Sequence, residues 1–483
     1  MTTTEYDVVI IGAGPVGENV ADRVVQGGLT AVVIEAELVG GECSYWACMP
    51  TKALLRDAAA LRAARQVPGA AAAITGTLDV SAVLARRDRF ASDWSDEGQV
   101  AWLDEAGITL VRGHGRVSGN RTVTVTDHDG RTTTLSARHA VVIATGSSAA
   151  LPSIPGLADA RPWTSRDAAS ARHIPERLAI IGGGVVGAEM STAYTALGAA
   201  VTLISRNGIL STVEPYAAQY VRESLVESGA RVMTGTAPST VSRDVDGTVR
   251  ITLADGGIVE ADELLVATGR TPNTADIGLE RVGLPAGSWL SVDDTLRVTD
   301  GHGTVVGNGW LYAVGDVNHR ALVTHQGKYQ ARAAGSVILA RAAGSPVQDI
   351  PWGRHSATAD QRAVPQVIFT DPEIASVGHT RASAEKARLP VRTVEYDLGA
   401  VAGAALHADG YTGRACMLVD EATSTVVGFT AVGPDVAELL HAATIAIAGE
   451  VPLDRLRHAV PAYPTVNEVW LRLLETADIP PTS

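Results

Sequence analysis

The sequence predicts an α/β fold in which one strand–turn–helix unit occurs twice and an α+β domain follows. Continuous apolar runs at 8–11 and 178–181 each lead into a glycine-rich turn and a helical stretch, as buried parallel strands do in βαβ units. The two copies are too far apart for a solenoid repeat, so we expect two separately folded units. From about residue 351, strand-like runs precede helical stretches at 435–449 and 465–476, which predicts an α+β domain.

Length and composition limit the class of protein. The chain of 483 residues is longer than one hydrophobic core usually supports, which predicts three or so domains. With 46% hydrophobic residues, 19% charged residues and a net charge of -14, the composition is globular and argues against a nucleic-acid surface. No apolar run reaches the roughly 18 residues that span a bilayer, and the N-terminus lacks a basic targeting region. Three cysteines are too few for a disulfide-stapled secreted fold, so we expect a cytoplasmic protein.

The first glycine-rich turn has the full context of a dinucleotide-binding fingerprint. Gly12 permits the tight turn, Gly14 lets the backbone approach a pyrophosphate, and Gly17 lets the helix pack closely on the strand. The next strand, residues 31–34, ends at Glu35, which can accept a hydrogen bond from a ribose hydroxyl. A glycine turn without a ligand is the weaker interpretation, because the strand, the helix and the acid all occur at the required spacing.

The second glycine-rich turn repeats the spacing of the first, but a different type of residue ends the strand that follows it. Gly182, Gly184 and Gly187 take the same three positions after the strand at 178–181. Its second strand ends at Ser205-Arg206 rather than at an acid. An acid there would repel a 2′-phosphate whereas Arg206 would pair with one, so the sequence favours NADPH over NADH. The alternative is a solvated arginine on a loop.

Two of the three cysteines, Cys43 and Cys48, lie five positions apart shortly after the first fingerprint. Such a pair can cycle between dithiol and disulfide, and a helix N-terminus or a nearby cation would lower a thiol pKa. In an ideal helix their Cα atoms would be roughly 8–9 Å apart. A disulfide needs roughly 4.4–6.8 Å, so the turn must be distorted if the pair bonds. Lys52 lies one turn after Cys48, and the fingerprint adjoins the pair. Both features favour a redox-active pair over two ordinary buried cysteines. The third cysteine, Cys416, is expected in the core.

The whole series of motifs resembles the flavoprotein disulfide reductases, the family of dihydrolipoamide dehydrogenase, glutathione reductase and mercuric reductase. The C-x4-C-x3-K segment, both fingerprints, Ala144-Thr145-Gly146, Ala267-Thr268-Gly269-Arg270, Gly315-Asp316 and the tail occur in the family's order. The resemblance implies two Rossmann-like dinucleotide-binding domains plus a C-terminal α+β dimerisation domain, with FAD on the first fingerprint and a nicotinamide cofactor on the second. It further implies a homodimer whose active site is completed by the other subunit.

The resemblance also implies domain boundaries. The FAD-binding domain would comprise two segments, 1–150 and 276–350, on either side of an NAD(P)-binding domain at 151–275. The dimerisation domain would occupy 351–478.

Particular roles follow from the same resemblance. Cys48 would be the flavin-proximal thiol that forms a charge-transfer pair with the ring, and Cys43 the interchange thiol that attacks the acceptor. Lys52 would lie beside the flavin and pair with Glu189, because a fixed cation stabilises the negative charge of reduced flavin. The residues expected at the FAD site are Gly12, Gly14, Pro15, Gly17, Glu35, Gly41, Lys52, Ala144, Thr145, Gly146, Gly315, Asp316 and His325. Those expected at the NAD(P) site are Gly182, Gly184, Val185, Gly187, Glu189, Ser205, Arg206, Gly269 and Arg270, and no metal site is predicted.

Two of these FAD-site assignments are specific. Asp316 would bind the ribityl chain of FAD, and His325 would lie near the pyrimidine end of the ring. A surface histidine is the alternative for His325. Val185 stands where some family members carry a gating tyrosine.

The chain departs from the family at the position of the catalytic base. Members that act on thiol substrates end with a motif like His-Pro-Thr-x-x-Glu, and this chain has Tyr463 in place of the histidine while Glu468 is kept. A phenol with a pKa near 10 is a poor base at neutral pH compared with an imidazole with a pKa near 6.5. His458 is an alternative base. Mercuric reductase also has a tyrosine here, but this sequence lacks the vicinal C-terminal cysteines of that enzyme.

Two further departures concern the acceptor and the nucleotide. Ser44-Tyr45-Trp46-Ala47 replaces the smaller residues usual between the cysteines, and Trp46 either narrows the acceptor's approach or packs in the core. Thr212 stands where NADPH sites of the glutathione reductase type have a second arginine, so the NADPH preference is expected to be partial.

These features together favour a pyridine nucleotide-disulfide oxidoreductase. Hydride would pass from NADPH through FAD to the Cys43–Cys48 pair, and on to a disulfide, a soft metal ion or a quinone. Tyr463 argues against routine lipoamide or glutathione chemistry, which gives metal and quinone acceptors more weight. Two alternatives stay open: a dihydrolipoamide dehydrogenase that uses NAD, and a redox-sensing flavoprotein that changes conformation without turnover.

Overall fold

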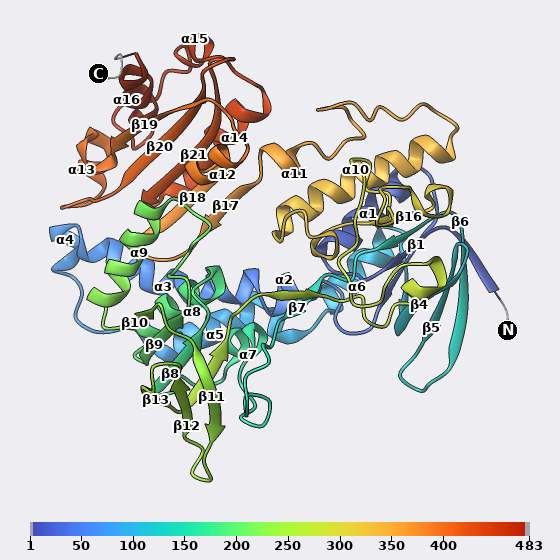
Figure 1. The fold of residues 1–483 in the computed structure, drawn as a ribbon, viewed down its shortest axis with the longest axis horizontal. Helices are drawn as coiled ribbons and strands as arrows, with labels where there is room; N and C mark the ends of the chain where they lie inside the picture. Colours follow the sequence, from blue (N-terminus) through green and yellow to red (C-terminus); the bar gives the residue numbers. More distant parts are fainter. Residues whose placement is uncertain (1–2, 479–483) are drawn as a thin grey trace. The chain divides into compact units, whose positions relative to one another are not determined.

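The computed structural model describes residues 3–478 and consists of two compact units (Figure 1). Each unit is assembled from segments that are distant in the sequence. Within the described residues, unit 1 comprises 3–50, 88–149 and 270–361, and unit 2 comprises 51–87, 150–269 and 362–478.

Unit 1 is built on a seven-stranded sheet in the order β3-β2-β1-β6-β5-β4, in which β16 also pairs with β6. The neighbours of β1 and β2 run parallel, and β16 is parallel to β6, whereas β4, β5 and β6 form an antiparallel meander. Val8, Val9 and Ile10 are fully buried, which explains the continuous apolar run in the sequence. The strands are β1 (Thr3–Ile11), β2 (Ala31–Glu35), β3 (Thr109–Arg112), β4 (His114–Gly119), β5 (Thr122–Thr126), β6 (Thr132–Ile143) and β16 (Leu311–Ala313).

Helix α1 follows β1 and packs against α10. Pro15 occupies the first position of α1, where its fixed φ suits a helix start and its missing N–H costs nothing. Small and β-branched side chains of α1, α10 and the sheet make one core with Val8, Ile10 and Val33. The helices used below are α1 (Pro15–Gln26), α2 (Gly41–Tyr45), η1 (Ser92–Trp94), α6 (Glu97–Glu105), η4 (Asp316–Asn318), α10 (Thr324–Ala342) and α11 (Ala359–Arg362). A short two-stranded pairing of β7 (Ser147–Ala149) with β15 (Arg270–Pro272) completes the unit.

Unit 2 contains a second parallel sheet in the order β10-β9-β8-β14. A three-stranded antiparallel sheet, β11-β12-β13, shares a hydrophobic core with it. The strands are β8 (Arg177–Ile181), β9 (Ala200–Ser205), β10 (Arg231–Thr234), β11 (Pro238–Arg243), β12 (Val249–Leu253), β13 (Ile258–Ala261) and β14 (Glu263–Val266). Helices α8 (Val185–Ala196) and α9 (Pro215–Glu227) belong to this part, and helix α3 (Cys48–Arg65) runs into unit 2 from Cys48.

The C-terminal part of unit 2 is a five-stranded antiparallel sheet in the order β17-β18-β21-β20-β19. Cys416 on β20 is buried in its core, as expected. The elements are β17 (Pro365–Ile368), β18 (Glu373–Gly378), α12 (Arg381–Lys386), β19 (Val391–Asp397), α13 (Ala402–His407), β20 (Arg414–Asp420), β21 (Thr425–Gly433), α14 (Leu440–Ala448) and α16 (Glu468–Ala477).

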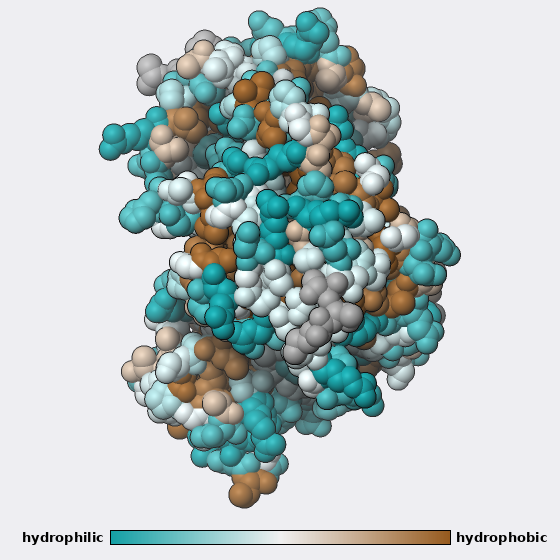
Figure 2. All heavy atoms as spheres, turned by 90° about the vertical axis from the view of Figure 1, so that its right-hand side faces the viewer, coloured by the Kyte–Doolittle hydropathy of each residue, from teal (hydrophilic) through white to brown (hydrophobic). Residues whose placement is uncertain are grey.

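The predicted fold class is confirmed, since two dinucleotide-type βαβ sheets precede an α+β region. On the face drawn in Figure 2, hydrophobic side chains occur in small groups between hydrophilic ones, the ordinary pattern of a protein surface. Within the part of the chain that the structure describes, no helix is long and apolar enough to cross a membrane.

Candidate active site

The cysteine pair lies in unit 1 at a break between two helices. Helix α2 ends at Tyr45 and helix α3 begins at Cys48, and Trp46 between them has a non-helical φ of -135° and ψ of -1°. This break supplies the distortion that an uninterrupted helix lacks. Both cysteines are thiols, and the thiol of Cys43 donates a hydrogen bond to Cys48.

The two thiols are electrostatically unequal. The hydrogen bond to Cys48 raises the pKa of Cys43, and burial raises it further, against smaller lowering effects of Thr324 and Lys328. Cys43 therefore holds its proton more tightly than a free thiol does. Cys48 is the first residue of α3, where aligned peptide dipoles favour an anion. Its sulfur lies 3.4 Å from the hydroxyl oxygen of Thr324, the first residue of α10.

The first fingerprint forms a cradle that only glycine permits. A Cβ added to Gly12, whose φ is +102°, would lie 2.5 Å from the Ala144 carbonyl oxygen, and one added to Gly17 would lie 2.0 Å from the Gly12 oxygen. A Cβ on Gly41 would lie 2.9 Å from the Cα of Gly14, so the backbone of the cysteine segment faces the fingerprint directly. This close approach of backbone at the start of α1 is the geometry that glycines give to the pyrophosphate-binding turn of a dinucleotide site.

The acid at the end of β2 is held beside the same cradle. Glu35 accepts hydrogen bonds from the backbone N–H groups of Ala13 and Glu37, each at 2.8 Å. Burial raises its pKa, and the two backbone bonds act in the opposite direction. The carboxylate is thus fixed in orientation, as a ribose-binding acid must be.

The predicted ribityl-binding residue Asp316 lies in a polar cluster of unit 1. Ser147 donates to the Asp316 carboxylate at 2.6 Å, and Arg270 donates to the Ser147 hydroxyl and carbonyl oxygens at 2.5 Å. Arg270 Nε lies 3.7 Å from Asp316, and Glu42 lies 3.8 Å from the guanidinium. The sequence placed Arg270 at the NAD(P) site, and the structure directs its side chain to Ser147 and Asp316. His325, the second residue of α10, is exposed.

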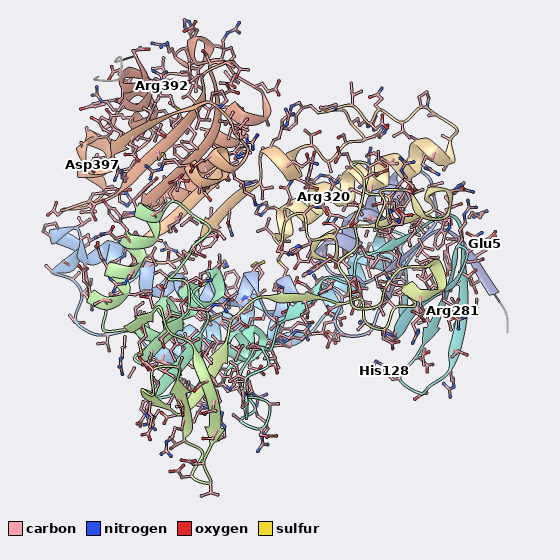
Figure 3. All side chains as sticks on the ribbon, viewed as in Figure 1. Glu5, His128, Arg281, Arg320, Arg392 and Asp397 are labelled. Atoms are coloured by element: carbon pink, nitrogen blue, oxygen red, sulfur yellow. The ribbon has the colours of Figure 1, made fainter. Side chains whose placement is uncertain are left out.

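A buried network that the sequence did not predict holds the Gly315-Asp316 turn. Gln330 Oε1 accepts hydrogen bonds from the Gly315 N–H at 2.7 Å and the Asn318 amide at 2.8 Å, and its own amide donates to Asp360. Arg320, labelled in Figure 3, lies 3.6 Å from the same carboxylate. These partners are far apart in sequence and belong to no motif, so spacing alone gave no signal for them.

In unit 2, Lys52 and Glu189 form an ion pair with Nζ and Oε2 2.8 Å apart. Glu189 is buried on α8, and its other oxygen accepts the backbone N–H of Phe369 at 2.9 Å. The ammonium also lies 5.1 Å from the centre of the Phe369 ring. The cation is therefore held in place by its ion pair and this ring while its side chain stays about one-third exposed, at 35%.

The second fingerprint repeats the backbone geometry of the first. A Cβ on Gly182 would lie 2.2 Å from the Ala267 oxygen, and one on Gly187 would lie 1.9 Å from the Gly182 oxygen, whereas Gly184 faces open space. Ser205 donates to the Gly208 oxygen at 2.5 Å. Arg206 is exposed and, within residues 3–478, makes no hydrogen bond or ion pair, so its charge is available to a ligand.

The residues around the missing histidine are not gathered into an acid–base group within the single chain. Tyr463 is 75% exposed and His458 is exposed. Glu468 is buried at the start of α16, and its carboxylate accepts the backbone N–H of Gly403 at 3.2 Å.

A pair of neighbouring thiols beside one glycine-rich turn of the dinucleotide-binding type, in a chain with a second such turn, is the arrangement expected of a nucleotide-dependent thiol oxidoreductase. The chain matches the family described as pyridine nucleotide-disulphide oxidoreductase over residues 6–340, and the dimerisation domain of that family over residues 364–473. The chain therefore belongs to the pyridine nucleotide-disulphide oxidoreductase family, whose members are FAD-dependent and use NAD(P)H.

Known proteins similar to the chain cover nearly all of it. Dihydrolipoyl dehydrogenase of Chlamydia pneumoniae is 32% identical over 97% of this chain and 96% of its own length. Mercuric reductase of Staphylococcus aureus is 30% identical over 96% of this chain and 81% of its own length. The crystal structure of LpdA from Mycobacterium tuberculosis matches with a TM-score of 0.81 and 26% identity over 99% of this chain and 100% of that one. RclA of Escherichia coli, a flavoprotein disulfide reductase, shares the fold with a TM-score of 0.81 and 22% identity over 98% of this chain and 99% of that one.

Proposed function

We propose that the chain is an NADPH-preferring flavoprotein reductase that acts as a homodimer and passes electron pairs through Cys43 and Cys48 to an acceptor. The observation that carries this proposal is the helix break, which brings the two thiols into hydrogen-bond contact with Cys48 at a helix N-terminus. Bound FAD supplies two-electron transfer between nicotinamide and sulfur. Oxidation of the pair forms one sulfur–sulfur bond and releases two protons and two electrons to the acceptor.

The residues of the FAD cradle support this cofactor. Gly12, Gly14, Gly17 and Gly41 leave backbone accessible to a pyrophosphate, and Glu35 is oriented for a ribose. Asp316 is oriented by Ser147 for the ribityl chain. Lys52, fixed by Glu189, provides the cation that stabilises negative charge on a reduced ring.

The preference for NADPH rests on Arg206. Its guanidinium lies at the end of β9, where nicotinamide dinucleotides place the 2′ substituent of the adenosine ribose. A charge-assisted hydrogen bond to a phosphate contributes more than one to a hydroxyl. Thr212 is exposed and offers no second cation, so we expect discrimination rather than exclusion of NADH.

Three acceptor classes remain within the proposal: a disulfide, a soft metal ion and a quinone. Dihydrolipoyl dehydrogenases and mercuric reductases are similar to this chain to nearly the same degree. Tyr463 in place of histidine disfavours thiol–disulfide exchange, which needs a base near neutral pH. We therefore rank soft metal ions and quinones before small disulfides.

Steady-state rates of the purified holoenzyme test this ranking. NADPH and NADH are each offered with oxidised lipoamide, glutathione disulfide, Hg(II), Cu(II) and naphthoquinones. Sustained NADPH oxidation that is faster with a metal ion or a quinone than with either disulfide supports the proposal. Fast lipoamide-linked reduction of NAD would instead identify a dihydrolipoamide dehydrogenase, and a single reduction without turnover with any acceptor would identify a redox sensor.

A further inference from the structure

The segment that carries Cys43 is held from outside by side chains of η1 and the start of α6. Trp94 donates from its indole nitrogen to the Tyr45 carbonyl oxygen at 3.1 Å. Asp96 accepts the backbone N–H of Val39 at 2.7 Å, and Arg112 pairs with the same carboxylate. The side chain of Gln99 contacts Gly40, Ser44 and Tyr45 of this segment. All of these residues belong to unit 1.

Gln99 and Tyr45 are the inner contacts of this arrangement. Tyr45 is 1% exposed, and its hydroxyl lies 2.9 Å from the Val39 carbonyl oxygen and in hydrogen-bond contact with the Gln99 carbonyl oxygen. The Gln99 amide nitrogen lies 3.4 Å from the Ser44 hydroxyl. The Gln99 amide also packs against Gly40. A Cβ added to Gly40 would lie 2.3 Å from both Nε2 and Oε1 of Gln99.

These contacts fix both sides of Cys43 without touching its sulfur. Gly40 precedes α2, whereas Ser44 and Tyr45 are its last two residues. Because α2 ends at Tyr45, the position of Cys43 relative to Cys48 depends on how α2 is held up to the break at Trp46. A buried polar contact of this kind restricts the backbone more than packing alone does.

We propose that Gln99 and Tyr45 are positioning residues that set the dithiol–disulfide equilibrium of Cys43 and Cys48. The inference rests on the proposed function, which makes this pair the redox-active one. In exchange with glutathione, two glutathione thiols reduce the protein disulfide to two thiols and form one glutathione disulfide. The equilibrium constant measures how closely the protein holds its own two sulfurs, so a looser α2 makes the disulfide easier to reduce.

The test equilibrates the holoenzyme with glutathione buffers of graded ratio, quenches with acid and counts alkylated Cys43 and Cys48 by mass spectrometry. Gln99→Leu keeps the approximate side-chain volume and removes both polar contacts. We expect the disulfide to be about tenfold easier to reduce, a shift of about 30 mV for a two-electron couple. Tyr45→Phe keeps the ring and removes only the hydroxyl, and we expect about a threefold effect in the same direction.

Gln219→Leu is the matched control, because this exposed glutamine of α9 bonds only to Glu223 within the described residues. It should leave the exchange constant unchanged. Melting temperature is recorded for each variant, since a merely structural role would lower it without moving the exchange constant. If Gln99→Leu does not fold, the exchange constants of Tyr45→Phe and Gln99→Met test the inference instead.

Variants that exchange within twofold of the unsubstituted protein would overturn the inference and leave the proposed function intact. A different failure is distinguishable from this one. If the unsubstituted holoenzyme never forms the Cys43–Cys48 disulfide in any buffer, the proposed function itself falls.

Discussion

The two glycine fingerprints share a backbone and differ in the side chains around it. Gly12 and Gly182 both turn with a positive φ against a carbonyl oxygen of the neighbouring strand end, and Gly17 and Gly187 both close on the oxygen of the first glycine. The first fingerprint then adds Glu35, while the second adds Arg206. Under the proposed function, the glycines would bind a dinucleotide and the residue at the strand end would select which one.

A second difference lies directly after the third glycine. Glu18 is buried on α1, and its Oε1 has no hydrogen-bond partner within the described residues, whereas Ala188 holds the equivalent buried position on α8. The first fingerprint is also closed by Gly41, while Gly184 faces open space. Under the proposed function, the resident FAD would occupy the closed site and the exchanging nicotinamide nucleotide the open one.

Adding one methyl group to each fingerprint gives the largest expected effect. In Gly17→Ala and Gly187→Ala the new Cβ would lie about 2 Å from a carbonyl oxygen, so helix and strand must separate, at a cost of about 1–3 kcal/mol or more. Gly17→Ala should be isolated without FAD and colourless. Gly187→Ala should be yellow and reducible by dithionite, but not by NADPH. Flavin absorbance per protein checks both, and loss of FAD from both variants would break the division of roles.

Cys48→Ser tests the role of the cysteine pair while leaving both nucleotide-binding turns intact. The unsubstituted protein should develop long-wavelength charge-transfer absorbance after one equivalent of reductant, because Cys48, at the N-terminus of α3, is the proposed flavin-proximal thiol. The variant should lose this band completely and keep its FAD. Cys43→Ser is the control and should retain the band. A band that survives in Cys48→Ser contradicts the assignment.

Arg206→Glu gives the strand after the second fingerprint an acidic end, like the one that Glu35 gives the strand after the first fingerprint. The carboxylate repels a 2′-phosphate, so kcat/KM for NADPH should fall by about 100-fold, in line with the loss of a charge-assisted bond. The value for NADH should change by less than about threefold. Arg222→Glu, an exposed change on α9, should alter neither value. Equal losses with both nucleotides would show that Arg206 supports the fold rather than selects the phosphate.

Glu18→Gln tests the difference at the position after the third glycine. Burial raises the pKa of Glu18 from 4.5 to about 7, with Glu35 adding to this effect and Lys328 opposing it. Since the folded state holds the proton more tightly than the unfolded state, the stability that this group contributes is greatest below pH 4.5 and is lost as the pH rises through 7. The loss amounts to about 3 kcal/mol at pH 8.

The amide introduced by Glu18→Gln cannot ionise, so the variant should melt at a higher temperature than the unsubstituted protein at pH 8 and at nearly the same temperature at pH 4.5. Scanning calorimetry at both pH values measures this difference. Glu105→Gln, an exposed change on α6, should show no such pH dependence. A gain of equal size at both pH values would point to packing rather than to charge.

Tyr463→His gives the smallest expected effect. An imidazole should raise the rate of glutathione disulfide or lipoamide reduction by a few fold, because it is a base near neutral pH. Rates with quinones, which need less proton transfer, should not change. Tyr463→Phe is the control and should show no gain. If histidine brings none either, the acceptor pocket and not the missing base limits the reaction.

Sequence patterns predicted the elements that carry local signals. The apolar runs before both fingerprints lie within β1 and β8, and the predicted strand at 31–34 lies within β2. The sequence predicted a distorted turn only if the two cysteines bond, and the break at Trp46 provides such a distortion between two free thiols. The position of that break was not predictable, because it depends on contacts of Tyr45 with residues some fifty positions later.

Other features could not be predicted from the sequence because they arise from pairing between distant segments. The antiparallel strands β4, β5, β11, β12 and β13 are short and bury at most alternate residues, so they lack the continuous apolar runs by which the buried parallel strands were found. Gln330 and Asp360 stand in no motif, and only the fold shows that they hold the Gly315 turn. Trp46 is half-buried against Tyr45 with ring centres 5.6 Å apart, so local packing accounts for part of its environment.

The carboxylate of Glu468 has a consequence for how this chain could change its chemistry. It is buried and already committed to the Gly403 amide, and a Cβ at Gly403 would lie 2.0 Å from the Thr465 carbonyl carbon, so neither partner can be exchanged freely. Only Oε2 of Glu468 takes part in this bond, so within the described residues the other oxygen is left to orient a histidine ring. Any thiol chemistry regained through Tyr463→His would therefore depend on the backbone at Gly403, which fixes the orientation of this acid, as well as on the new imidazole.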